Sequence, residues 1–128
     1  MIHIETYCGK YDGEIIDLIL SIQNGENHIG LTLDEQPDLK AIKANYSGKG
    51  GEFWTALDDD RLIGTIGLMM KSEGYAVLKK FFVHKDYRSQ KIGLKLYMTL
   101  LDFAKSHGVK HIFLDTPAAA KQSHTNNQ

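Results

Sequence analysis

The sequence predicts an α+β domain in which a mixed, mainly antiparallel sheet is flanked by helices. Two apolar segments, 52–57 and 61–70, are joined only by the acidic turn Asp58-Asp59-Asp60, which indicates an antiparallel hairpin. Later, an amphipathic segment at 92–107 separates two strand-like segments, and such a unit usually forms a right-handed crossover between parallel strands. Because 128 residues suffice for one core but not for two, we expect a single domain over residues 1–128.

The first part of the chain is predicted to form a strand followed by two helices. Residues 1–7 alternate apolar and polar side chains, as a half-buried strand does. Residues 12–23 carry isoleucines on one helical face, and Asp12 is placed to cap that helix. Residues 26–34 are polar and contain glycine, which favours a loop. A second helix is expected over 37–46, because it begins with a proline.

The second part of the chain is predicted to complete the sheet. After the hairpin, a third strand covers residues 75–83. The helix over 92–107 carries apolar residues at helical spacing, and Gly108 is suited to end it. A last strand follows at 111–114, which we expect to lie parallel to the strand at 75–83.

Composition excludes several classes of partner. The formal net charge of −1 argues against broad binding to nucleic acid or to an anionic membrane. No apolar run reaches the ~20 residues that span a bilayer, and the N-terminus lacks the features of a signal peptide. The single cysteine, Cys8, forms no intrachain disulfide, which favours a reducing, cytoplasmic setting. The histidines show no ligand spacing with Cys8 or with acidic residues, so no metal site is expected.

The segment from Leu78 to Leu94 is the most informative part of the chain. It leads from an apolar strand through a basic loop directly into the long helix. The free amides of a first helical turn and the positive end of the helix dipole attract phosphate. Arg88 and Lys91 add positive charge at that place, where cations without an anion would oppose the dipole. The segment therefore predicts a site for an elongated, anionic ligand.

This order of elements, with Arg88-Ser89-Gln90-Lys91-Ile92-Gly93 at the start of the long helix, closely resembles the GCN5-related N-acetyltransferases (GNAT). The signature of that family is Gln/Arg-x-x-Gly-x-Gly/Ala, and Arg88 and Gly93 occupy its first and last positions. Lys91 stands where the first glycine is expected, which is a departure. Its side chain either adds a charge for phosphate or crowds a backbone that needs the freedom of glycine.

The resemblance covers nearly the whole chain and implies the GNAT fold, with acetyl-CoA as co-substrate. The implied reaction is attack by a neutral primary amine, of a small molecule or a protein, on the thioester. A backbone amide near Phe82 or Val83 would polarise the thioester carbonyl. The residues implied for binding acetyl-CoA are Phe81, Phe82, Val83, Arg88, Ser89, Gln90, Lys91, Ile92, Gly93 and Leu94.

The catalytic and acceptor residues are less defined by the sequence. His84 and Tyr87 are the candidates for catalysis, although a solvated turn residue explains His84 better than a catalytic base does. Glu26, Glu35 and Tyr46 fall where the family lines its acceptor pocket. Neither the general base nor the general acid follows from the sequence.

Two further departures bear on activity. Val77 stands where relatives often carry a glutamate, and a Phe-Tyr-x-x-x-Gly-Phe segment that supplies a tyrosine acid in many members is missing. We therefore expect a fold that is shortened at the C-terminus, with Asn126-Asn127 in the place of the Phe-Tyr pair or with that segment lying beyond residue 128. An open edge at strand 111–114 would then favour a homodimer. The alternative function is a catalytically impaired module that binds CoA or a partner chain as a sensor or assembly protein.

Overall fold

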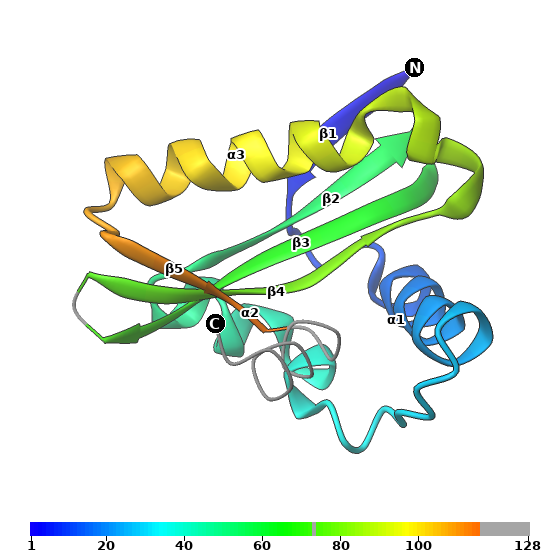
Figure 1. Ribbon diagram of the computed structural model, residues 1–128, viewed down its shortest axis with the longest axis horizontal. Helices are drawn as coiled ribbons and strands as arrows, with labels where there is room; N and C mark the ends of the chain where they lie inside the picture. The colour runs from blue at the N-terminus through cyan, green and yellow to red at the C-terminus, as the bar shows by residue number, and fades with distance from the viewer. Residues whose placement is uncertain (73, 116–128) are drawn as a thin grey trace, which may run out of the picture.

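The chain folds into one mixed sheet with helices on both faces (Figure 1). The computed structural model describes residues 1–72 and 74–115. The strands lie in chain order, and every pairing is antiparallel except that of the last two, which is parallel. The mixed sheet predicted from the sequence is therefore confirmed. The strands are β1 (Ile2–Thr6), β2 (Glu52–Asp58), β3 (Arg61–Ser72), β4 (Tyr75–Val83) and β5 (His111–Leu114).

Among the described residues, one long helix covers one face of the sheet. This helix, α3 (Ile92–Ser106), places four residues at four-residue spacing against the strands, so its apolar stripe is fully buried. Gly108 follows with a φ of 73°, which is the left-handed conformation expected of a residue after a helix end. The predicted boundary was therefore correct to one residue. The buried stripe consists of Ile92, Leu96, Leu100 and Ala104.

The opposite face is covered by shorter, interrupted helices (Figure 1). Helix α1 (Asp12–Leu20) continues as a π-helical turn at Ser21–Glu26. The continuous helix predicted for 37–46 is wrong: a 3₁₀ helix (Pro37–Lys40) and α2 (Ile42–Asn45) are separated at Ala41, whose φ of −150° is extended. A further 3₁₀ turn follows at Ser47–Lys49.

The predicted capping role of Asp12 is also wrong. Tyr11 occupies the N-cap position of α1, and no side chain there makes a capping hydrogen bond. Asp12 instead begins the helix, and its carboxylate accepts a hydrogen bond of 2.6 Å from the Tyr7 hydroxyl. An acidic residue still suits this first turn because of the helix dipole.

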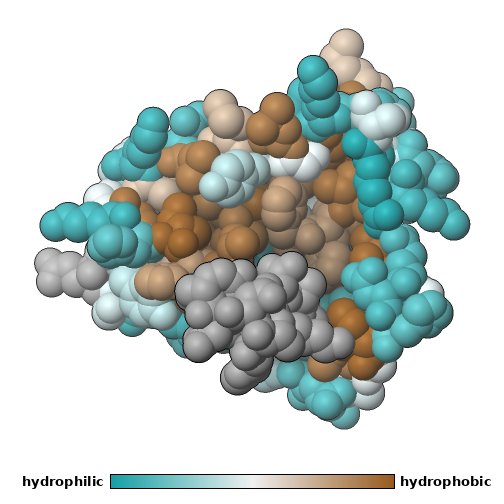
Figure 2. Space-filling view, viewed as in Figure 1, coloured by the Kyte–Doolittle hydropathy of each residue, from teal (hydrophilic) through white to brown (hydrophobic). Residues whose placement is uncertain are grey.

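Strand β5 lies at the edge of the sheet among the described residues. Phe113 and Leu114 on this strand are 52% and 63% exposed, and Figure 2 shows apolar side chains gathered across this side of the molecule beneath α3. Pairing of a second copy at this edge stays a prediction. No helix in residues 1–72 and 74–115 is both long and apolar enough to cross a membrane.

Candidate active site

Strand β4 leaves its neighbour β5 half-way along its length. The two strands pair from Tyr75 to Leu78, and the Asp115 amide adds a last hydrogen bond to the Leu78 carbonyl. No described strand pairs with residues 79–83 on the side away from β3. The backbone groups on that side have no strand partner, although the Val83 carbonyl accepts a hydrogen bond from the Arg88 side chain.

A β-bulge shapes the open half of β4. Gly67 pairs with Lys79 and Thr65 with Phe82, so one extra residue is inserted on β4. Lys80 adopts a φ of 54° there, and its carbonyl accepts a hydrogen bond of 2.7 Å from the Thr65 hydroxyl. The bulge therefore turns the side chains of both Lys79 and Lys80 into the same cleft.

A cleft of about 1020 Å³ lies between this half of β4 and the segments that follow α1. It brings together six of the residues predicted from the sequence, four for the cofactor and two for the acceptor. These residues come from two distant parts of the chain, 26–35 and 81–88, so the fold alone joins them. They are Phe81, Phe82, Val83, Arg88, Glu26 and Glu35.

Arg88 ties two walls of the cleft together. Its Nε donates to the Val83 carbonyl at 3.0 Å, and its terminal nitrogen lies 2.6 Å from a carboxylate oxygen of Glu26. The other predicted acceptor residue, Glu35, accepts hydrogen bonds from the amide and the hydroxyl of Thr32, at 2.9 and 3.0 Å. Glu26 and Glu35 therefore both line the cleft, and each carboxylate already interacts with another residue of the protein.

The basic loop leads into the first turn of α3 as predicted. A 3₁₀ helix (Lys85–Gln90) precedes Lys91, whose φ of 59° is left-handed, and α3 begins at the next residue. Ser89, Gln90, Lys91 and Leu94 are exposed, whereas the side chain of Ile92 is fully buried. Ile92 is 0% exposed, so the exposed groups at this helix start come from its neighbours.

Gly93 brings the first turn of α3 close to the open half of β4. A Cβ built on this residue would lie 3.5 Å from the Phe81 ring and 3.7 Å from a Val83 methyl group, which are ordinary van der Waals contacts. Packing alone therefore leaves room for a Cβ at this position.

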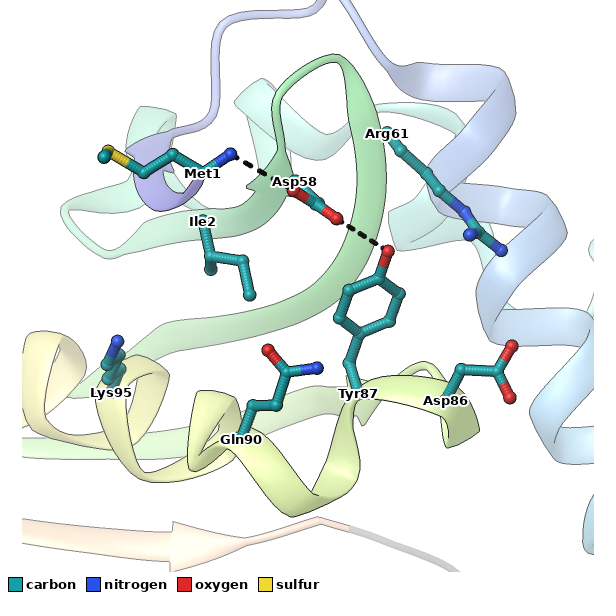
Figure 3. A pocket seen from close by; sticks show the side chains of 8 residues that line it. All are labelled: Met1, Ile2, Asp58, Arg61, Asp86, Tyr87, Gln90 and Lys95. Atoms are coloured by element: carbon teal, nitrogen blue, oxygen red, sulfur yellow. Dashed lines mark hydrogen bonds and ion pairs between the residues drawn. The ribbon is translucent and has the colours of Figure 1, made fainter.

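The two catalytic candidates are not among the residues that line the cleft. Tyr87 lines a separate pocket of about 690 Å³ (Figure 3), where its hydroxyl donates to Asp58 at 2.8 Å. His84 caps the 3₁₀ helix by accepting a hydrogen bond from the Asp86 amide at 3.1 Å, and its other ring nitrogen faces Arg61 at 3.3 Å. Both side chains therefore have structural partners.

Tyr46 lies in the core and reaches the cleft only through a neighbour. Its side chain is fully buried, and its hydroxyl donates a hydrogen bond of 2.6 Å to Asp38. Burial, followed by the nearby Asp38 charge, raises the pKa of Tyr46 well above its ordinary value. Asp38 itself lines the cleft and pairs with Lys80, whose Nζ is 3.3 Å from the same carboxylate oxygen.

Sequence reasoning did not assign Asp38 and Lys80 to the site. The signal for Lys80 was two consecutive lysines within an otherwise apolar strand. Among the described residues, no three His, Cys, Asp or Glu side chains form a group that would hold a metal ion.

An open, bulged fourth strand beside the start of a long helix is the arrangement that defines the acetyltransferase class implied by the sequence. The chain belongs to the acetyltransferase (GNAT) family, whose model matches residues 16–124. The predicted family and fold are thereby confirmed.

Curated relatives support this assignment. The "Probable N-acetyltransferase camello" of Xenopus tropicalis is 34% identical over 82 residues, which cover 62% of this chain and 37% of that protein. The human "N-acetyltransferase 8" is 29% identical over 85 residues, with the same coverage. The chain thus spans less than two fifths of the length of these relatives.

Solved structures are similar over almost the whole chain. A GNAT-family acetyltransferase from Staphylococcus aureus Mu50 has a TM-score of 0.89 and 39% identity, and the match covers 99% of this chain and 82% of that one. An acetyltransferase from Streptococcus agalactiae 2603 has a TM-score of 0.88 and 33% identity, with coverages of 98% and 79%. A Brucella melitensis GNAT acetyltransferase solved with acetyl-CoA has a TM-score of 0.72 at 17% identity, covers 94% and 80%, and supports the fold alone.

Proposed function

We propose that this protein transfers the acetyl group of acetyl-CoA to a primary amine of a small molecule or a protein. The observation that carries the proposal is the open half of β4, which faces the cleft and leads through a basic loop into α3. The relatives named above are N-acetyltransferases, which favours an enzyme over the non-catalytic module. The cytoplasmic setting belongs to the same proposal.

The described residues fit acetyl-CoA in chemistry. The amide-rich arm of the ligand needs backbone donors and acceptors, which residues 79–83 offer on their open side. The diphosphate needs cations and free amides, and the first turn of the 15-residue helix α3 lies beside the exposed side chain of Lys91. Arg88 is within reach of the same region because its side chain is anchored on Val83.

The reaction requires that the thioester carbonyl is polarised as the amine attacks. A backbone amide on the open side of β4, near Phe82 or Val83, would stabilise the developing negative charge on that oxygen. The acceptor enters between α1 and β4, where Glu26 and Glu35 line the cleft. Carboxylates there would attract a cationic amine before it loses its proton.

Binding is tested by thermal unfolding with and without acetyl-CoA. A ligand that binds only the native state stabilises it by RT ln(1 + [L]/Kd), which is about 2.7 kcal/mol at a hundred times Kd. Turnover is tested by release of the CoA thiol over a panel of amines. Stabilisation with no turnover on any amine would favour the module, and no stabilisation at millimolar acetyl-CoA would contradict the proposed site.

A charge reversal locates the diphosphate. Lys91→Glu places a negative charge at the start of α3, and we expect acetyl-CoA affinity to fall by about tenfold or more. Lys105→Glu makes the same change in the last turn of the helix and serves as the matched control. Equal affinities of the two variants would show that the anion binds elsewhere.

A further inference from the structure

A buried ionic cluster forms part of the wall of the cleft. The Nζ of Lys80 and the Oδ2 of Asp38 are 3.3 Å apart, and their side chains are only 10% and 9% exposed. The Tyr46 hydroxyl donates to the same oxygen at 2.6 Å. Both charged residues line the cleft, so a ligand there would contact them.

The backbone at Lys80 is strained in order to hold this arrangement. A positive φ is uncommon for a residue other than glycine, and such outliers gather at functional sites, where the surrounding structure maintains them. The Thr65 hydroxyl holds the Lys80 carbonyl, and the bulge turns the lysine toward Asp38. Well-packed apolar side chains would often stabilise a fold as well as a buried ion pair does. Stability alone therefore does not explain the cluster.

Lys80 is paired as an ammonium with Asp38, and burial acts against its charge. Burial lowers the pKa of Lys80, and the neighbouring Lys79 acts in the same direction. Asp38 and Asp115 oppose this shift, but Asp115 is itself paired with Lys79 at 3.3 Å. Tyr46 stays protonated because its pKa is raised, so it donates to Asp38 and contributes no charge.

We propose that Lys80 is the proton-transfer residue of this acetyltransferase and that Asp38 is its positioning residue, an inference that rests on the proposed function. The acceptor enters as a neutral amine, after its ammonium has lost one proton to water. Its nitrogen attacks the thioester carbonyl carbon and forms the C–N bond, and the C–S bond breaks with its electron pair on sulfur. The Lys80 ammonium gives a proton to the thiolate, and neutral Lys80 then takes the surplus proton from the acylated nitrogen.

This cycle leaves an amide, a free CoA thiol and Lys80 as the ammonium with which it began. Asp38 stabilises that ammonium at 3.3 Å, and the Tyr46 hydroxyl fixes the carboxylate. Val77, three residues earlier on β4, is apolar and buried, so it supplies no proton acceptor. Lys80 performs both transfers in its place.

The test compares Lys80→Arg, Lys80→Met and the matched surface variant Lys105→Met. Lys80→Arg keeps the positive charge beside Asp38 but does not deprotonate in this pH range. With the amine that the wild type acetylates best, we expect kcat/KM to fall about 100-fold or more in both Lys80 variants, with acetyl-CoA affinity retained. Lys105→Met should match the wild type. An active wild type whose Lys80→Arg variant keeps more than about a third of kcat/KM overturns the inference.

The pH profile separates a proton-transfer role from a structural one. Asp38→Asn removes the charge that favours the Lys80 ammonium, so the basic limb of kcat/KM should move to lower pH. An unmoved limb would overturn the positioning role of Asp38.

If the Lys80 variants do not fold, the wild type is tested instead, by labelling its amines with acetic anhydride at a series of pH values. Lys80 should then react at lower pH than Lys105, and equal midpoints would overturn the inference. A wild type inactive on every amine would instead reject the proposed function.

Discussion

The two faces of the sheet are built in different ways. On one face, α3 is a single helix of 15 residues whose buried stripe is wholly apolar. On the other face, α1, α2 and the short turns between them are interrupted, and they enclose buried polar residues. The buried polar residues on the α1–α2 side include Gln23, Gln36 and Asp38.

This difference separates the stable scaffold from the site. Apolar burial on the α3 face is non-directional and gives stability in proportion to area. Buried polar groups on the other face must each find a partner, which fixes their geometry. The cleft opens on the second face, where Asp38 and Lys80 lie. The residues proposed for proton transfer therefore lie on the face where buried side chains are held by hydrogen bonds and ion pairs.

The largest effect is expected on the α3 face. Leu100→Ala removes a fully buried side chain, and we expect the free energy of unfolding to fall by about 3 kcal/mol, from lost transfer energy and the cavity left behind. Urea denaturation measures this change. Met98→Ala on the exposed side of α3 is the control, with an expected change of about 0.5 kcal/mol or less. Similar losses in both variants would contradict the difference between the two sides of α3.

A smaller change in the free energy of unfolding is expected at Gln23 and Gln36. It arises from hydrogen bonds, which depend on direction, rather than from buried area. Gln23 and Gln36 exchange two hydrogen bonds, at 2.9 and 2.8 Å, while nearly fully buried. Gln23→Ala leaves Gln36 without that partner, and we expect a loss of about 2 kcal/mol. Replacing both residues by leucine should cost less than this single change, because no polar group is left unpaired. A double variant that loses more than the single one would refute the polar-pair explanation.

The α3 side of the fold could be predicted because its signals are local. Strands 75–83 and 111–114 have the predicted bounds, and the helix ends one residue earlier than expected. Apolar periodicity determines such elements, and a glycine marks the end of the helix. On the other face the predicted helix over 37–46 is split, because tertiary contacts override a weak local preference.

The candidate site was only partly predictable for a related reason. The loop before α3 carries its own signature, so its place at the end of β4 could be expected. The role of Lys80 depends on a bulge, and strict alternation would have placed Lys79 and Lys80 on opposite faces. Asp38 meets Lys80 only through the fold, since 41 residues lie between them in the chain. No sequence spacing reports such a contact.

The substitution Tyr46→Phe tests a buried polar contact on the α1–α2 side of the sheet through the pH dependence of stability. Loss of the hydrogen bond to Asp38 should lower the free energy of unfolding by about 1.5 kcal/mol at pH 7. Because the folded pKa of Tyr46 is raised, its stabilising contribution is fully present below the unfolded value near 10 and is lost as pH rises above it. The difference in the free energy of unfolding between the wild type and the Tyr46→Phe variant should therefore narrow by about 1 kcal/mol at pH 11.

Urea titrations at pH 7 and pH 11 measure both quantities. Tyr7, whose pKa is raised to about 12 by burial and by its hydrogen bond to Asp12, titrates in both proteins and cancels. A gap that stays constant between the two pH values would mean that Tyr46 does not hold its proton more tightly when folded.

The smallest effect is expected at the helix entrance, where the chain departs from the family signature. Lys91 adopts a left-handed conformation that glycine reaches without steric cost, so Lys91→Gly should raise the free energy of unfolding by about 1 kcal/mol. Lys95→Gly, one turn into α3, should instead lower it by about 1 kcal/mol, because glycine weakens a helix interior. Opposite signs for the same substitution four residues apart would identify backbone strain as the cause. If Lys91→Gly destabilises as well, the side chain of Lys91 contributes more to the fold than its backbone conformation costs.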